Sequence, residues 1–231
     1  FPVTDVANAM AGFRALGVRG VSVTIPHKQA VIDHLDEIDP VAARIGAVNT
    51  LVIDNGRIKG LNTDWLGANR ALESRMRLAG STVLLLGNGG SARAIGFGLV
   101  EAGAGVIIAS RNQTAGEALA ASLNCPWHPL AQAGTLSADG LVNATSVGMG
   151  PLSNESPMPA SALANFSVVM DIVYAPLHTR LLREAEAAGC RTVDGLAMLL
   201  FQGVAQFELW TGQSAPIDLM RDQLLARLAG K

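Results

Sequence analysis

The chain has 231 residues, of which 49% are hydrophobic and 16% charged, and its formal net charge is −2. This composition is typical of one or two globular domains and excludes an intrinsically disordered chain. The charges are scattered, so the basic stripe of a nucleic-acid binder is missing, and every apolar tract is interrupted before it reaches the length of a membrane span. We therefore expect neither a nucleic acid nor a membrane as partner.

The two cysteines, Cys125 and Cys190, lie far apart and lack the spacing of a metal site. They indicate reduced thiols in a cytoplasmic protein, and no secretory signal is expected. The chain opens FPVTDVANAM without an initiator methionine, which is typical of a fragment or a processed product. The sequence leaves open whether the protein is a monomer or a homodimer.

A first helix is predicted to follow Thr4, a residue type that often caps helices. Its predicted apolar face contains Val6, Met10, Phe13 and Leu16, which recur at helical spacing. The glycines at 17 and 20 are expected to end this helix.

The segment SVTIPHK (22–28) ends a short buried strand that begins at residue 20. Pro26 cannot donate a ladder hydrogen bond, so the strand stops there and Lys28 follows at its carboxyl end, where α/β sheets bind ligands. Residues 28–46 predict a helix with a break near DPVA. Two short strands flank the hairpin signal Asp54-Asn55-Gly56, and residues 64–76 predict another helix.

After residue 80, strands that are apolar throughout alternate with helices. Such strands are typical of a parallel sheet that is covered on both faces. Two helices then close the chain. The predicted strands are TVLLL, GVIIASRN, DGLVNAT, SVVMDIVY and RTVDG.

The fold class predicted from this order is α/β, with a Rossmann-like, doubly wound parallel domain over residues 65–195. That domain would be inserted in a smaller α/β domain formed by residues 1–64 and 196–231. The functional site is expected in the cleft between the two domains.

A dinucleotide-binding loop is predicted where LLLGNGGSA fits the pattern G-x-G-x-x-A between a strand and a helix. Gly87 permits the tight turn, Gly89 lets the backbone approach a pyrophosphate, and Ala92 lets the helix pack closely on the strand. The free N–H groups at the start of the helix would face the anion. A glycine-rich turn without a ligand is the alternative. The predicted cofactor contacts in this loop are Gly87, Asn88, Gly89, Gly90 and Ser91.

The end of the second strand of this domain predicts NADP rather than NAD. NAD-binding folds usually place an acid there to hold the ribose 2′-hydroxyl. Here the strand ends with Ser110, Arg111 and Asn112, and a guanidinium suits a 2′-phosphate in charge and geometry. A solvated arginine at a strand end is the alternative.

Several blocks of the sequence together resemble those of shikimate dehydrogenases, in the same order and at similar spacing over essentially the whole chain. The blocks are SVTIPHK, GAVNTLV, GLNTD, GNGGSA, NATSVGM, DIVYAPLHT and DGLAMLLFQG. The resemblance implies NADP-dependent, reversible reduction of 3-dehydroshikimate to shikimate, a step toward aromatic amino acids. It leaves two alternatives: a quinate/shikimate dehydrogenase that uses NAD, and a non-catalytic NADP-binding remnant.

The resemblance implies that Lys28 and Asp64 are the catalytic residues. Reduction of a ketone by hydride leaves an alkoxide, which needs a proton or a positive charge nearby. Lys28 would deliver the proton, and Asp64 would orient it and bind a substrate hydroxyl. On its own, a lysine after a strand is usually a solvated charge.

The resemblance also implies further contacts. For the substrate these are Thr24, Asn49, Tyr174 and Gln202, and near the nicotinamide they are Ile172 and Gly195. Plain core packing is an equally good interpretation of Ile172. The family's two serines that bind the substrate carboxylate, and its first strand, would precede Phe1. Trp65 has no predicted role.

Overall fold

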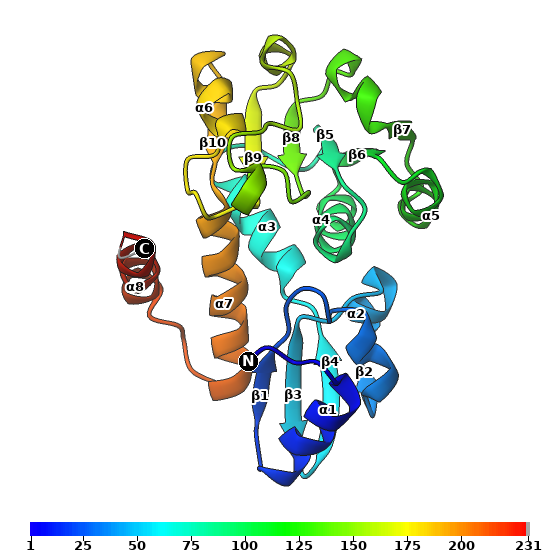
Figure 1. Cartoon of the computed structure of the whole chain (residues 1–231), viewed down its shortest axis with the longest axis vertical. Helices are drawn as coiled ribbons and strands as arrows, with labels where there is room; N and C mark the ends of the chain where they lie inside the picture. The colour runs from blue at the N-terminus through cyan, green and yellow to red at the C-terminus, as the bar shows by residue number, and fades with distance from the viewer. Residues whose placement is uncertain (230–231) are drawn as a thin grey trace.

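The computed structural model describes residues 1–229, which form two lobes joined by two helices (Figure 1). The small lobe contains α1 (Val6–Ala15), β1 (Gly20–Ser22), a 3-10 helix (Ala30–His34), β2 (Glu37–Ile38), α2 (Pro40–Ile45), β3 (Thr50–Asp54) and β4 (Arg57–Leu61). The large lobe contains β5 (Thr82–Leu86), α4 (Gly90–Glu101), β6 (Gly105–Ser110), α5 (Gln113–Leu123), β7 (Trp127–Pro129), β8 (Gly140–Asn143), β9 (Val168–Asp171), α6 (Arg180–Ala187) and β10 (Arg191–Val193), with 3-10 segments at Leu130–Thr135, Gly150–Leu152 and Ala160–Asn165. Helices α3 (Asp64–Glu73) and α7 (Gly195–Thr211) run between the lobes, and α8 (Ile217–Ala229) lies beside α7.

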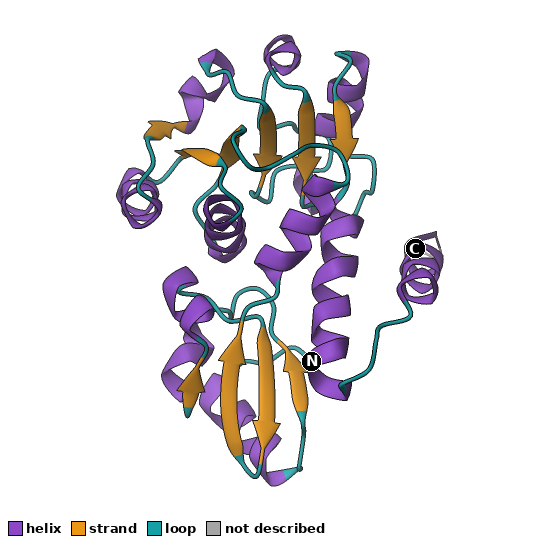
Figure 2. Ribbon diagram, turned by 180° about the vertical axis from the view of Figure 1, so that it is seen from behind, coloured by secondary structure: helices purple, strands orange, loops and turns teal. Residues whose placement is uncertain are grey.

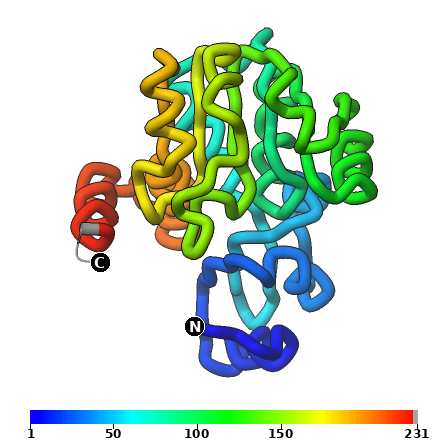
Figure 3. The backbone as a smooth tube through the Cα atoms, turned by 45° about the horizontal axis from the view of Figure 1, so that its top comes forward, coloured from blue at the N-terminus to red at the C-terminus, as the bar shows by residue number. Residues whose placement is uncertain are grey.

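The small lobe is a four-stranded sheet in the order β1-β3-β4-β2, with β2 parallel to β4 and the other pairs antiparallel. The predicted hairpin is confirmed, because Asn55 and Gly56 have φ angles of 47° and 77°, as a two-residue turn of this kind requires. Helix α1 lies at the end of the lobe remote from the large lobe (Figure 3). Its Met10 packs in one core with Leu51 and Ile58.

Two details predicted for the first helix are wrong. Asp5, not Thr4, caps it, because the Asp5 carboxylate accepts a hydrogen bond of 2.9 Å from the backbone N–H of Asn8. Leu16, predicted on the apolar face, lies just after the last helical residue and is 80% exposed.

Residues 28–46 were predicted as helical with a break near DPVA, and helix α2 does begin there, at Pro40, but strand β2 before it was not predicted. A 3-10 helix, strand β2 and helix α2 occupy this range. Helix α2 begins at Pro40 because Asp39 accepts hydrogen bonds from two N–H groups of its first turn. Strand β2 has only two residues, so it carries no periodicity that the sequence could reveal.

The large lobe confirms the predicted doubly wound parallel sheet, whose strand order is β10-β9-β8-β5-β6-β7. Strand β5 is buried on both faces. Val83 and Leu85 contact the layer of α3, α4, α5 and α7, whereas Leu84 and Leu86 contact the layer that contains α6. The edge strand β7 was not predicted, because Pro126 and Pro129 flank a segment without an apolar run.

Helices α3 and α7 lie between the two groups of strands and connect them (Figure 2). Their axes approach closely, because a Cβ atom on Gly67 of α3 would lie only 2.7 Å from the carbonyl oxygen of Met198 in α7. The predicted domain boundaries near residues 64 and 196 fall at the starts of these two helices. The assignment of a substrate-binding and an NADP-binding domain to the two parts stays a prediction.

An apolar cluster, here called the joint cluster, packs the lobes together beside α3. It contains Ile45 and Ala47 of the small lobe and Ala94 and Phe97 of the large lobe. Trp65 of α3 packs against it, with its ring edge-on to that of Phe97 at a centroid distance of 5.9 Å. Trp65 therefore has a packing role at the joint of the two lobes.

Candidate active site

The glycine loop lies where β5 ends and α4 begins, in the middle of the parallel sheet. At this point the chain order reverses between β5 and β8, and such switch points bind ligands. Gly87 has a φ of 114°, and a Cβ atom on it would lie 2.9 Å from the carbonyl oxygen of Ala144, so only glycine suits this turn. A Cβ atom on Gly89 would meet nothing within 4 Å. Gly89 caps α4 without any side-chain hydrogen bond, so no side chain at the cap satisfies the first N–H groups of α4.

An exposed arginine, Arg111, follows the last residue of β6. Ser110 is 3% exposed, accepts a hydrogen bond of 3.0 Å from the Trp127 indole and donates one of 3.1 Å to the Asn112 carbonyl. Asn112 caps α5 with its side chain, and Asn88 donates to its carbonyl oxygen at 3.2 Å. These three predicted cofactor contacts therefore bind one another. Arg111 is exposed beside them and is the group available to a phosphate.

The two predicted catalytic residues form a buried ion pair. Lys28 Nζ lies 2.6 Å from Asp64 Oδ2, and their side chains are 13% and 6% exposed. Lys28 follows the end of β1, whereas Asp64 opens α3, where its N–H donates to the side-chain oxygen of Asn62 at 2.9 Å. The fold thus joins two residues that are 36 positions apart in the sequence.

Lys28 also touches the glycine loop of the other lobe. A Cβ atom on Gly90, the first residue of α4, would lie 3.7 Å from Lys28 Cδ. The Lys28 carbonyl accepts a hydrogen bond of 2.7 Å from the N–H of Val48, which anchors its backbone to the small lobe. The ammonium of the small lobe is therefore held alongside the loop that could bind a pyrophosphate.

Asn49 and Gln202 complete a polar group around Asp64. Asn49 Oδ1 accepts a hydrogen bond of 2.8 Å from the N–H of Thr63, and this fixes which end of the amide carries the nitrogen. Asn49 Nδ2 donates to Asp64 Oδ1 at 2.8 Å and to Gln202 Oε1 at 3.4 Å. We call Lys28, Asn49, Asp64 and Gln202 the central site.

Two predicted substrate contacts are not hydrogen-bonded to the central site within the described residues. Thr24 and Tyr174 are exposed, and within residues 1–229 their side chains make no hydrogen bond to it. Ile172 and Gly195 lie together at the carboxyl end of β9. A Cβ atom on Gly195 would overlap the carbonyl oxygen of Ile172, so the start of α7 needs glycine there.

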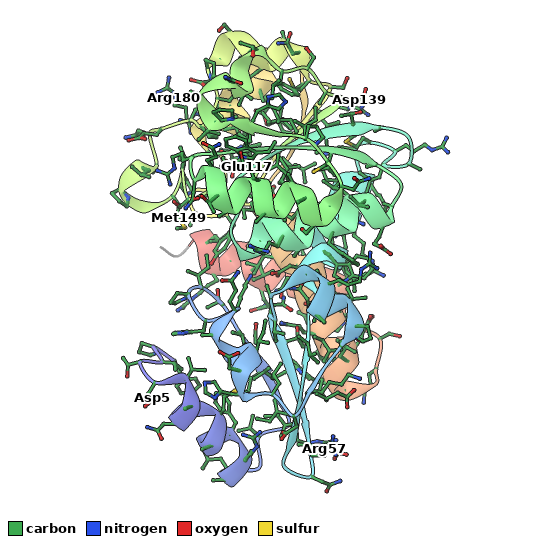
Figure 4. All side chains as sticks on the ribbon, turned by 90° about the vertical axis from the view of Figure 1, so that its right-hand side faces the viewer. Asp5, Arg57, Glu117, Asp139, Met149 and Arg180 are labelled. Carbon is green, nitrogen blue, oxygen red and sulfur yellow. The ribbon has the colours of Figure 1, made fainter. Side chains whose placement is uncertain are left out.

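A buried carboxylate that the sequence did not single out joins the loops after β8 and β9. Asp171 is 0% exposed and accepts hydrogen bonds from Asn143 Nδ2 at 2.9 Å, Thr179 Oγ1 at 2.7 Å and the N–H of Val173 at 3.0 Å. Burial raises the pKa of Asp171 to about 6, and the three hydrogen bonds oppose this rise. The same β8 loop carries Met149, which lies on the side of the large lobe nearest the small lobe (Figure 4).

Gln206 is the second polar residue that sequence reasoning missed. It is 4% exposed and lies one helical turn after Gln202 on α7. Its only signal was an amide side chain within a largely apolar helix. Its amide nitrogen donates to the backbone carbonyl of Asn49 at 3.1 Å, directly behind the central site.

Two family models match parts of this chain. Residues 1–51 match the shikimate dehydrogenase substrate binding domain, and residues 195–225 match the shikimate 5′-dehydrogenase C-terminal domain. A curated shikimate dehydrogenase (NADP(+)) of Moorella thermoacetica is 45% identical over 98% of this chain and 80% of its own length.

Solved structures of similar proteins agree in fold over nearly the whole chain. Shikimate 5-dehydrogenase from Thermus thermophilus, in complex with NADP(H) and shikimate, gives a TM-score of 0.88 at 39% identity over 96% of this chain and 84% of that one. Quinate dehydrogenase from Corynebacterium glutamicum, in complex with NAD, gives a TM-score of 0.89 at 34% identity over 97% of this chain and 84% of that one.

Proposed function

The chain belongs to the shikimate dehydrogenase family, and from this we propose that it catalyses the NADP-dependent, reversible reduction of 3-dehydroshikimate to shikimate. The observation that carries this proposal is the Lys28–Asp64 ion pair, which is buried and lies against the glycine loop. This ion pair holds a proton donor of the small lobe, Lys28, beside the glycine loop of the large lobe.

The residues present fit NADP. The open space at Gly89 and the uncapped start of α4 suit the pyrophosphate, and the exposed guanidinium of Arg111 suits the 2′-phosphate. Ile172 and Gly195 would border the nicotinamide. When bound, the nicotinamide supplies the hydride for reduction or takes it up in the reverse reaction.

The central site supplies the proton and the orientation. Lys28 Nζ donates its proton to the ketone oxygen as negative charge develops there, and its positive charge stabilises that oxygen. Asp64 holds the ammonium in place through Oδ2. Asn49 and Gln202 bind ring hydroxyls, and Thr24 and Tyr174 contact the substrate at the rim of the site.

Steady-state rates with shikimate and with quinate, each with NADP and with NAD, test this function. We expect the highest kcat/KM with shikimate and NADP. Faster oxidation of quinate with NAD would identify a quinate dehydrogenase instead. Tight NADP binding without turnover of either substrate would favour a non-catalytic remnant.

The proposed partner is a small molecule. Among residues 1–229, no helix combines the length and apolarity that crossing a membrane requires. A monomer or a homodimer, and a cytoplasmic location, stay predictions from the sequence.

A further inference from the structure

Gln206 connects helix α7 to the back of the central site. Its amide nitrogen lies within hydrogen-bond distance of three oxygens of the small lobe, which are Thr50 Oγ1 at 3.0 Å, the Asn49 carbonyl at 3.1 Å and Ser22 Oγ at 3.2 Å. Gln206 and Thr50 are 4% and 0% exposed, so water does not compete for the bond between them, whereas Ser22 is exposed. The amide of Gln206 is therefore a fixed donor inside the small lobe.

This donor adds to a chain of hydrogen bonds whose direction the Thr63 N–H also helps to fix. Because an amide nitrogen only donates, Thr50 Oγ1 accepts from Gln206, and its own hydrogen is free for Asn49 Oδ1 at 2.7 Å. Asn49 Oδ1 then accepts from Thr50 and from the N–H of Thr63. With its oxygen held by two donors, the Asn49 amide must point its nitrogen at Asp64 Oδ1.

We propose that Gln206 is a positioning residue of the enzyme, which acts through Thr50 and Asn49 on Asp64. We call Gln206, Thr50, Asn49 and Asp64 the relay. Every bond in the relay has one allowed direction, and it ends at the carboxylate that holds Lys28 Nζ. The effect of Gln206 on catalysis rests on the proposed function. The hydrogen bonds of the relay do not, because they are present without substrate.

A purely structural role is the competing explanation, because Gln206 also ties α7 to the small lobe. Trp210 offers a matched comparison on the same helix. Its indole N–H donates to the carbonyl of Leu51 at 3.0 Å, so it ties α7 to the same strand β3 without touching Asn49. Trp210→Phe therefore removes a tie of the same kind and leaves the relay intact.

The kinetic test compares Gln206→Met, which keeps the volume and removes the amide, with Trp210→Phe. We expect Gln206→Met to lower kcat/KM for shikimate about tenfold, the equivalent of one lost buried hydrogen bond, through both a lower kcat and a higher KM. Its Kd for NADP is expected to stay unchanged, since none of the relay residues is among the predicted NADP contacts. Trp210→Phe should lower the unfolding midpoint and leave kcat/KM within about twofold.

A double-mutant cycle with Thr50→Val separates action through Thr50 from an independent effect. If Gln206 acts through Thr50, the double variant is no more than about twofold worse than the poorer single variant. Losses that multiply would overturn the relay. Equal kinetic losses in Gln206→Met and Trp210→Phe would overturn it as well.

The relay can also be tested without any substrate. Hydrogen exchange of the Thr63 amide, which donates to Asn49 Oδ1, is measured by NMR in the ligand-free protein. We expect faster exchange in Gln206→Met and no change in Trp210→Phe. If exchange is faster in Gln206→Met but the wild-type protein does not turn over shikimate, the proposed function is wrong and the relay stands. If exchange is unchanged in Gln206→Met, the relay is wrong and the proposed function is unaffected.

Discussion

At the scale of single residues, burial and neighbours rather than residue type distinguish the central site. Lys28 and Lys59 each lie 2.6 Å from a carboxylate oxygen. The Lys28 side chain is 13% exposed and lies against the glycine loop, whereas that of Lys59 is 40% exposed and pairs with Glu37 on the surface. Of these two lysines, only Lys28 is shielded from water and lies against the glycine loop.

We therefore expect Lys28→Ala to lower kcat by about 10²- to 10⁴-fold, the usual contribution of a general acid, with a small change in KM. Lys59→Ala is the matched control and should leave both constants nearly unchanged, because exposed ion pairs contribute little. Steady-state kinetics with shikimate and NADP check both. A Lys28→Ala enzyme with nearly full kcat would show that the proton comes from elsewhere.

Asp171 predicts a pH effect on stability. Its folded-state pKa of about 6 exceeds the ordinary value of 3.8, so the folded protein binds this proton more tightly than the unfolded chain. The resulting stabilisation is complete below about pH 4 and is lost as the pH rises through 6, by about 3 kcal/mol in total. The Asp171→Asn variant has no titrating group at this position. The free energy of unfolding of the wild type, minus that of Asp171→Asn, should therefore fall as the pH rises from about 4 through 6.

Denaturant unfolding at a series of pH values measures this difference. A difference that stays constant over the range would show that Asp171 keeps an ordinary affinity for its proton in the folded protein.

Several site residues could be named from the sequence, but their contacts could not. Lys28 and Asp64 stand in recognisable blocks, yet nothing in the sequence states that these blocks meet. Asp171 and Gln206 gave no usable signal, because an aspartate at the end of a strand and a glutamine in a helix are usually solvated. Their burial depends on neighbours that only the fold supplies.

At the scale of elements, close helix contacts determine which side chains reach the site. A Cβ atom on Gly67 of α3 would lie 2.7 Å from the Met198 carbonyl oxygen and 2.9 Å from the Gln202 backbone nitrogen of α7. These are backbone atoms, so a methyl group at position 67 must push the helices apart. The displacement would move Gln202 relative to Asp64.

Gly67→Ala is therefore expected to lower the free energy of unfolding by about 1–3 kcal/mol, the usual cost of overpacking. Gly12→Ala in α1 is the control. A Cβ atom there meets nothing within 4 Å, so this change should stabilise the protein by about 0.5–1 kcal/mol through helix propensity. Denaturant unfolding gives both values, and effects of the same sign would contradict the tight α3–α7 contact.

The elements that could be predicted are those with a strong pattern of their own. Strand β5 is an apolar run, and Asn55-Gly56 has the turn chemistry of a hairpin. Strands β2 and β7 are two and three residues long, and pairing with β4 and β6 alone makes them strands. Such elements are consequences of the tertiary fold, so local sequence could not reveal them.

At the scale of the whole molecule, apolar packing rather than charge joins the lobes. The joint cluster buries Phe97 to 4% exposure between residues of both lobes. The ion pair between Arg44 of α2 and Glu101 of α4 also crosses between the lobes at 3.0 Å, but its side chains are 63% and 42% exposed. An exposed pair of this kind is screened by water and salt.

Phe97→Ala should accordingly lower the free energy of unfolding by about 3–5 kcal/mol, whereas Glu101→Gln should change it by less than about 1 kcal/mol. Chemical denaturation at low and high salt measures both. A larger effect of Glu101→Gln that disappears in high salt would show that charge holds the lobes together.

The continuity of helix α7 fixes the relative positions of two parts of the proposed site. Gly195, which is proposed to border the nicotinamide, and Gln202, in the central site, lie seven residues apart on one continuous helix. A rise of about 1.5 Å per residue separates them by roughly 10 Å along the axis, a spacing as rigid as the helix. The helix therefore fixes the spacing between the residue proposed to border the nicotinamide and the residue proposed to bind the substrate ring. Changes in the loops outside α7 leave this spacing unaltered.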